Sequence, residues 1–160
     1  MTTPSGPPTP SGPPTTADAE TVGAVQRALA AEHAVVWALQ LVTAFVAADV
    51  ATAVAESEAA HRARRDATSR VLRDRGASPV AAEPGYATPA PVTDQPSALA
   101  LLVTAESDVA AAWRSVIEHT DDAAVRALAA ESLTDAAVRA TRWRRAAGQV
   151  PPTVPFPGAP

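Results

Sequence analysis

The sequence predicts an all-α fold, a bundle of four helices, and two observations predict it. The chain of 160 residues is rich in alanine and only 4% aromatic, a composition that favours closely packed helices over a sheet. Glycine and proline divide it into long stretches with helical periodicity. Short breaks join these stretches into two hairpins, and one long proline-rich segment separates the hairpins.

The helices are expected at about residues 18–46, 49–75, 97–119 and 121–148. Asp18 can cap the start of the first helix, and Asp121 or Asp122 can cap the fourth. Gly76 follows the second helix as a C-cap.

The segment between the hairpins, residues 77–96, cannot be helical because it contains Pro79, Pro84, Pro89, Pro91 and Pro96. Such a long connection without secondary structure needs a reason in a small domain. We expect it to cross the length of the bundle, so that antiparallel hairpins are joined by one long crossover. That connectivity is the ferritin-like topology.

The bundle is expected at residues 18–149, and both ends of the chain differ from it in composition. Residues 1–17 are rich in Pro, Gly, Ser and Thr, repeat PSGPP, and are expected to form a disordered arm that a proline-reading partner could bind. Residues 150–160 are expected to form an extended Pro-rich tail. The arm lacks the basic start and apolar run of a signal peptide, so a cytoplasmic location is expected.

Composition excludes several classes of function. A net charge of −4 argues against nucleic-acid binding. Without cysteine or lysine there is no thiol chemistry, no Cys-based metal site and no Schiff-base lysine. No stretch reaches the roughly 18 apolar residues of a membrane span. Residues 35–46 come closest and are apolar nearly all round, which indicates either burial on all sides or a homodimer contact, and the contact is favoured.

Carboxylates fall among the apolar residues on the expected core faces. Glu32 fills a gap in the apolar stripe of the first helix, and Glu106 lies near the centre of the third helix's apolar face. In the second helix His61 falls in the middle of the apolar face and Glu58 toward its edge, in a Glu-x-x-His pair.

These residue types point to a metal, because an unpaired carboxylate is costly in a core and a cation removes that cost. Inward Glu residues with Glu-x-x-His are the ligands of carboxylate-bridged di-iron and di-manganese bundles. In the fourth helix the offset from the first hairpin favours Glu131, whereas the helical wheel favours Asp135. Either residue, or neither, supplies that ligand.

A structural interpretation competes with the metal. Glu58 can pair with Arg62 one turn later, and arginines can bridge Glu32 and Glu106 across the bundle. The three tryptophans, one on each of three helices, are most simply core anchors: Trp37, Trp113 and Trp143.

Residues from about 20 to 158 resemble an actinobacterial ferritin-like domain family whose function is not established. The resemblance is carried by ALAAEHAVVWAL (28–39), HRARRDA (61–67), RGASPVAAEPGYATPAPVTD (75–94), LTDAAVRATRWR (133–144) and FPG (156–158). It implies a ferritin-like fold. The wider ferritin-like group would make Glu32 a terminal ligand, Glu58 the metal bridge, His61 the nitrogen ligand and Glu106 a ligand of the second metal.

Three functions follow as hypotheses. The first is a metal-free bundle with a structural or protein-interaction role. The second is a di-iron or di-manganese carboxylate protein with ferroxidase- or oxidase-type activity, with iron or manganese as its cofactor. The third is a small-molecule site between the helices. Whether the chain is an enzyme stays open at this point.

Overall fold

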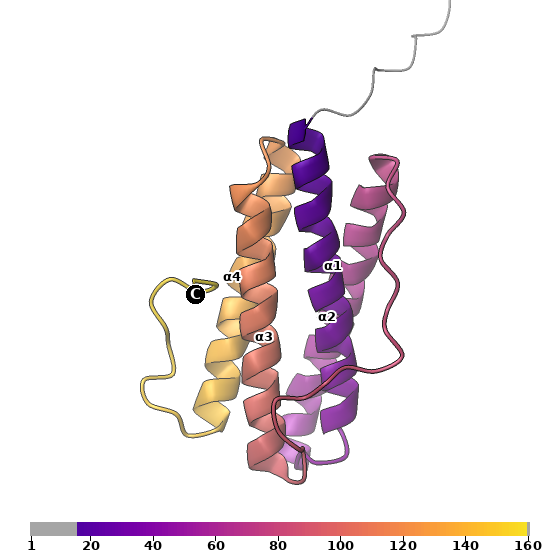
Figure 1. Cartoon of the computed structure of the whole chain (residues 1–160). Coiled ribbons are helices and arrows are strands. Elements are labelled where there is room, and N and C mark those ends of the chain that lie inside the picture. The colour runs from indigo at the N-terminus through magenta and orange to yellow at the C-terminus, as the bar shows by residue number, and fades with distance from the viewer. Residues whose placement is uncertain (1–15, 160) are drawn as a thin grey trace, which may run out of the picture.

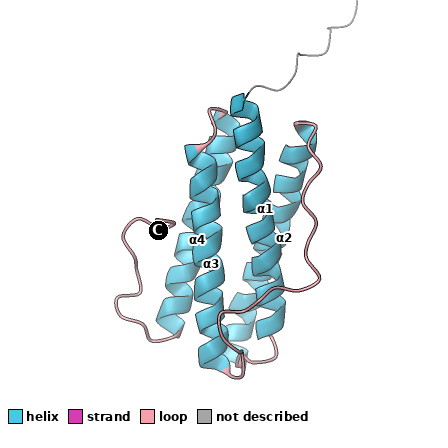
Figure 2. Ribbon diagram, in the orientation of Figure 1, coloured by secondary structure: helices cyan, strands magenta, loops and turns pink. Residues whose placement is uncertain are grey.

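The computed structural model describes residues 16–159, and four helices make up most of them (Figures 1 and 2). They are α1 (Thr16–Val42), α2 (Ala48–Asp74), α3 (Gln95–Glu118) and α4 (Ala123–Ala146), and no strand occurs in the described part of the chain. The prediction of an all-helical fold with four helices is confirmed. Residues 1–15 of the predicted arm lie outside the described residues.

The helix boundaries differ most from expectation in α1. This helix already includes Thr16 and Ala17, which were assigned to the arm, and it ends at Val42 rather than near residue 46. The chain turns through residues 43–46, where the Thr43 hydroxyl donates a hydrogen bond to the Gln40 carbonyl at 2.7 Å. Ala47 then caps α2 in an extended conformation. No glycine or proline marks this turn, so composition gives no signal for it.

Polar caps fix the starts of α3 and α4. Asp94 and Ser97 form a reciprocal capping box at the start of α3. At the start of α4 the cap is Asp122, not Asp121, and its carboxylate accepts hydrogen bonds from the amides of Ala124 and Val125 at 2.8 and 3.0 Å.

The path of the chain places α1 and α3 side by side, with α2 against α1 and α4 against α3. In Figure 1, α1 descends, α2 returns upward, residues 75–94 run down the outside of the molecule, α3 rises and α4 descends. α3 contacts both α1 and α4, and α1 contacts α2. The outer segment is tied to α1 by Gln26, whose side chain donates to the Ser78 carbonyl and accepts from the Val80 amide.

The apolar end of α1 is covered within the chain. Val35, Leu39 and Val42 are fully buried, and Phe45 and Val46 pack against the same core. The all-round apolar character of residues 35–46 is therefore accounted for within one chain. Among the described residues, no helix is long and apolar enough to cross a membrane.

The C-terminal tail leaves α4 and doubles back toward α3 (Figure 1). Gly158 lies so close to α3 that a Cβ atom there would approach the Ala110 carbonyl oxygen to 2.7 Å. Its φ of 77° is also a conformation that favours glycine. The tail was expected to be extended, and the close approach of Gly158 to Ala110 is one contact of its return path.

Candidate functional site

The centre of the bundle holds a histidine between two carboxylates. His61 of α2, Glu32 of α1 and Glu106 of α3 are all completely buried. The His61 Nδ1 atom lies 2.8 Å from Glu32 Oε2, and its Nε2 atom lies 3.2 Å from Glu106 Oε1. The two ring nitrogens point in different directions, so the two carboxylates approach the imidazole from different edges. One side chain thereby joins three helices.

The protonation of His61 follows from these neighbours. Burial by itself lowers the pKa of the imidazole, but the hydrogen bonds and negative charges of Glu106 and Glu32 outweigh burial and raise the pKa above the ordinary 6.5. The protonated ring carries an N–H on both nitrogens. In that state His61 donates one hydrogen bond to each carboxylate.

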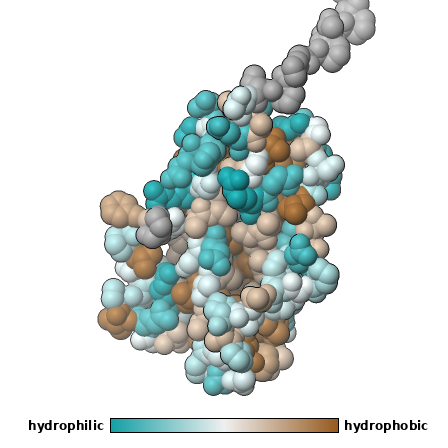
Figure 3. Space-filling view, viewed as in Figure 1, coloured by the Kyte–Doolittle hydropathy of each residue, from teal (hydrophilic) through white to brown (hydrophobic). Residues whose placement is uncertain are grey.

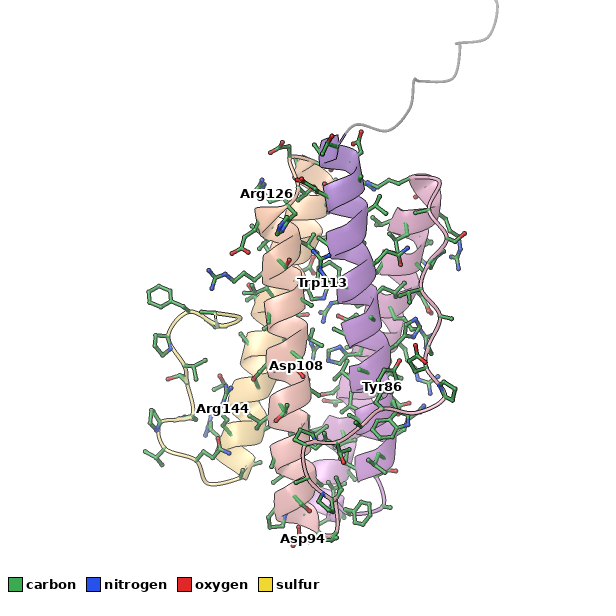
Figure 4. The ribbon with its side chains drawn as sticks, in the orientation of Figure 1. Tyr86, Asp94, Asp108, Trp113, Arg126 and Arg144 are labelled. Atoms are coloured by element: carbon green, nitrogen blue, oxygen red, sulfur yellow. The ribbon has the colours of Figure 1, made fainter. Side chains whose placement is uncertain are left out.

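Two tryptophans complete the polar core. The indole N–H of Trp113 donates to Glu32 Oε1 at 2.7 Å, and Figure 4 shows Trp113 between α3 and α1. The indole N–H of Trp143, from α4, donates to Glu106 Oε1 at 3.4 Å. Glu32 thus has a partner on each oxygen. The second oxygen of Glu106 is buried and has no hydrogen-bond partner among the described residues.

An arginine extends the polar core toward α4. Arg64, one turn after His61, has only 9% of its side chain exposed and places Nη1 3.8 Å from Glu32 Oε1. Its Nη2 atom donates to Asp135 Oδ2 of α4 at 2.6 Å. Glu32 therefore lies near both His61 and the guanidinium of Arg64, whose shortest ion pair is with Asp135.

Of the residues predicted for the site, the structure brings together Glu32, His61 and Glu106. Glu58 lies at the edge of the α1–α2 pair, where it accepts hydrogen bonds from Arg62 Nε and Nη2 at 2.9 and 2.7 Å and from Gln40 Nε2 at 3.0 Å. Partial burial tends to raise the pKa of Glu58, but these donors lower it overall. Glu58 is therefore held away from the central histidine, in the pairing that the structural interpretation expected.

The two candidates from the fourth helix also lie outside the centre. Glu131 is exposed. Asp135 has 45% of its side chain exposed and pairs with Arg64 and, at 3.8 Å, with Arg139. The sequence pattern missed the hydrogen-bonding role of the two tryptophans and the specific role of Arg64. The available signal was helical spacing, because Arg64 follows His61 by three residues and Trp113 follows Glu106 by seven.

The central side chains form a hydrogen-bonded network in which His61 uses both ring nitrogens. Among the described residues, no three His, Asp or Glu side chains are grouped so that they could hold a metal ion. A metal bound to one nitrogen of His61 would meet one of the central carboxylates and not the other, since each carboxylate faces a different nitrogen. Glu58, the expected bridging ligand, is engaged by Arg62 and Gln40.

Comparisons with known proteins agree on the family. A family model described as "Domain of unknown function (DUF4439)" matches residues 24–160. The chain is similar to the crystal structure of a conserved hypothetical protein, rv2844, from Mycobacterium tuberculosis, at 38% identity and a TM-score of 0.78. The match covers 84% of this chain and 99% of that chain. The comparison with curated proteins finds no match. With most of its length matched by the family model, the chain belongs to the DUF4439 family, whose function is not established.

Proposed function

We propose that the chain is a metal-free helical bundle with a structural or protein-interaction role, locked at its centre by the Glu32–His61–Glu106 network. The observation that carries the proposal is the engagement of both ring nitrogens of His61 by carboxylates. A protonated, doubly hydrogen-bonded imidazole has no lone pair to give to a metal. The positive charge that the buried carboxylates require comes instead from His61 and Arg64.

The composition of α2 supports a structural role for the network. The buried residues of α2 are Val54, Ser57, His61, Thr68 and Leu72. Only two of them are apolar, so α2 lacks the continuous apolar stripe that usually fastens a helix to a bundle. His61 lies between Val54 and Leu72 on this helix and contacts carboxylates of both α1 and α3. Buried ionic groups of this kind specify one register at some cost in stability.

The di-iron or di-manganese alternative requires two rearrangements. Glu58 would have to leave Arg62 and Gln40, and His61 would have to present a bare nitrogen to a point shared by several carboxylates. The first change breaks three hydrogen bonds, and the second breaks the bond between His61 and one central carboxylate. The residues present favour the metal-free state.

The proposal includes a ferritin-like topology, antiparallel within each hairpin, with the proline-rich segment as the crossover. The course of residues 75–94 along the outside of the bundle supports it (Figure 1). A homodimer, expected from residues 35–46, has less support, because the large side chains of that segment pack into the chain's own core.

The test is the metal content of untagged protein purified after growth with iron and manganese, beside His61→Ala and Glu58→Ala variants. We expect no metal in the wild-type protein above the level in the variants, and no rise in Tm when Fe²⁺ or Mn²⁺ is added under anaerobic conditions. A metal that binds the native state raises stability by mass action. Stoichiometric metal in the wild-type protein that is lost in both variants would overturn the proposal.

A further inference from the structure

Exposed apolar side chains gather around the C-terminal half of α4. The described residues include five large apolar side chains that are exposed, and four of them lie on α4 or the tail that follows it: Val138, Val150, Val154 and Phe156. Phe156 is 81% exposed and Val138 45%. In Figure 3 brown apolar residues appear at the left edge, on the side where Figure 1 shows the tail. Apolar residues that cluster at a surface mark binding sites more often than scattered ones do.

A groove lies between this face of α4 and the tail. It has a volume of about 630 Å³, within the range of small-molecule sites. Its apolar lining comes from Leu133, Ala137 and Val138 on α4 and from Val154 and Pro157 on the tail. The α4 residues recur at helical spacing, so the floor is a strip along the helix axis. The shape suits an extended hydrocarbon chain.

The charge at this groove is positive. Arg142 and Arg145 line it, and neither side chain forms an ion pair or a hydrogen bond with any residue that the structure describes. The sequence after Asp135 contains four arginines and no acidic residue, although the whole chain has a net charge of −4. Guanidinium groups favour carboxylates, which they can bind through two parallel hydrogen bonds.

We propose that this groove binds a long-chain fatty carboxylate. The alkyl chain lies on the strip formed by Leu133, Ala137 and Val138 and is covered on one side by the tail. The carboxylate is bound by Arg142 and Arg145. This site is separate from the buried network of His61, and the inference does not depend on the proposed function.

The tail forms one wall of the groove, and Gly158 packs closely against the Ala110 carbonyl beyond it. Val154 and Pro157, which line the groove, precede this anchor by four residues and one residue. Binding therefore depends on the docked tail as well as on α4.

The experiment titrates the full chain with palmitate below its critical micelle concentration, by displacement of a fluorescent fatty acid. The test variant is Arg142→Gln/Arg145→Gln. Its matched control is Arg70→Gln/Arg73→Gln on α2, where two exposed arginines have the same spacing and no ion pair within the described chain. We expect about tenfold weaker binding in the test variant and no change in the control. Val138→Asp should abolish binding by placing a carboxylate on the floor.

Two further ligands separate the contribution of the carboxylate to binding from that of the alkyl chain. Palmityl alcohol, which lacks the charge, should bind about tenfold more weakly than palmitate, and acetate should not compete. Absence of palmitate binding to the wild-type protein, or equal loss in test and control variants, would overturn the proposal. Binding to vesicles of anionic phospholipid without binding to monomeric palmitate would overturn it in favour of a membrane surface.

Discussion

Replacing His61 with leucine removes the positive charge at the centre of the bundle. Glu32 loses its partner at 2.8 Å, and Glu106 loses its partner at 3.2 Å and retains only the indole of Trp143 at 3.4 Å. Both carboxylates are completely buried, so water cannot replace the lost donors without opening the core. Leucine has a volume close to that of histidine, so most of the effect reports charge and hydrogen bonding rather than a cavity.

The expected cost is about 3–5 kcal/mol, the usual effect of breaking a buried ion pair by removing one partner. Domains of this size have a free energy of unfolding of about 5–15 kcal/mol and lose roughly 2–4 °C in Tm per kcal/mol. We therefore expect Tm to fall by about 10–15 °C. Urea unfolding followed by tryptophan fluorescence measures the free energy directly, and Trp113 and Trp143 report on the core because both contact its carboxylates.

The triple variant Glu32→Leu/His61→Leu/Glu106→Leu serves as the control. Replacing a whole buried ionic group by apolar residues of similar size is often neutral or stabilising, so this variant should recover most of the loss. A free energy of unfolding for His61→Leu within about 1 kcal/mol of the wild-type value would refute the reasoning. So would a triple variant that is less stable than the single one.

Further predictions concern pH, α4 and the tail. Because the pKa of His61 is raised in the folded state, its contribution to stability is complete below the ordinary value of 6.5 and is lost as the pH rises through the folded value. Denaturant titrations from pH 6 upward should show this loss in the wild-type protein and not in His61→Leu. Asp135→Ala should cost about 1–2 kcal/mol by leaving the buried Arg64 without its acceptor, whereas Glu131→Ala, exposed on the same helix, should stay within about 0.5 kcal/mol in the same assay. Gly158→Ala should release the tail and speed amide exchange around residues 150–159, because its Cβ would meet the Ala110 carbonyl; Gly85→Ala, with open space around it, should not. Slow exchange in both glycine variants would contradict the assigned anchor.

Local signals in the sequence made the fold and half of the site predictable. The prolines between residues 77 and 96 and the cap at Asp122 mark where helices cannot continue or must begin. Helical periodicity placed Glu32, His61 and Glu106 on core faces, and all three are completely buried.

The direction of the other polar side chains depends on three-dimensional neighbours. Glu58 lies at the edge of its face, where Arg62 and Gln40, a residue from another helix, draw it away from the centre. In α4 the buried positions are largely alanines, so the periodicity of large side chains blurs the inward direction. The wheel nonetheless ranked Asp135 as more inward than Glu131, and the structure agrees.

The C-terminal tail was the least predictable segment. Its prolines and glycines rule out a helix but say nothing about where an irregular segment packs. The return of the tail depends on the fit of Gly158 against Ala110, a contact between residues far apart in the sequence. Only the fold brings these two residues together.

The most direct test of the account is the protonation state of His61, read from the ¹⁵N resonances of the imidazole ring at neutral pH. A hydrogen-bonded ion network predicts an imidazolium with a proton on both nitrogens. Its resonances should stay unchanged when Zn²⁺, a diamagnetic substitute for Fe²⁺, is added. A ring with one bare nitrogen whose resonance shifts on adding Zn²⁺ would contradict the network and identify His61 as a metal ligand.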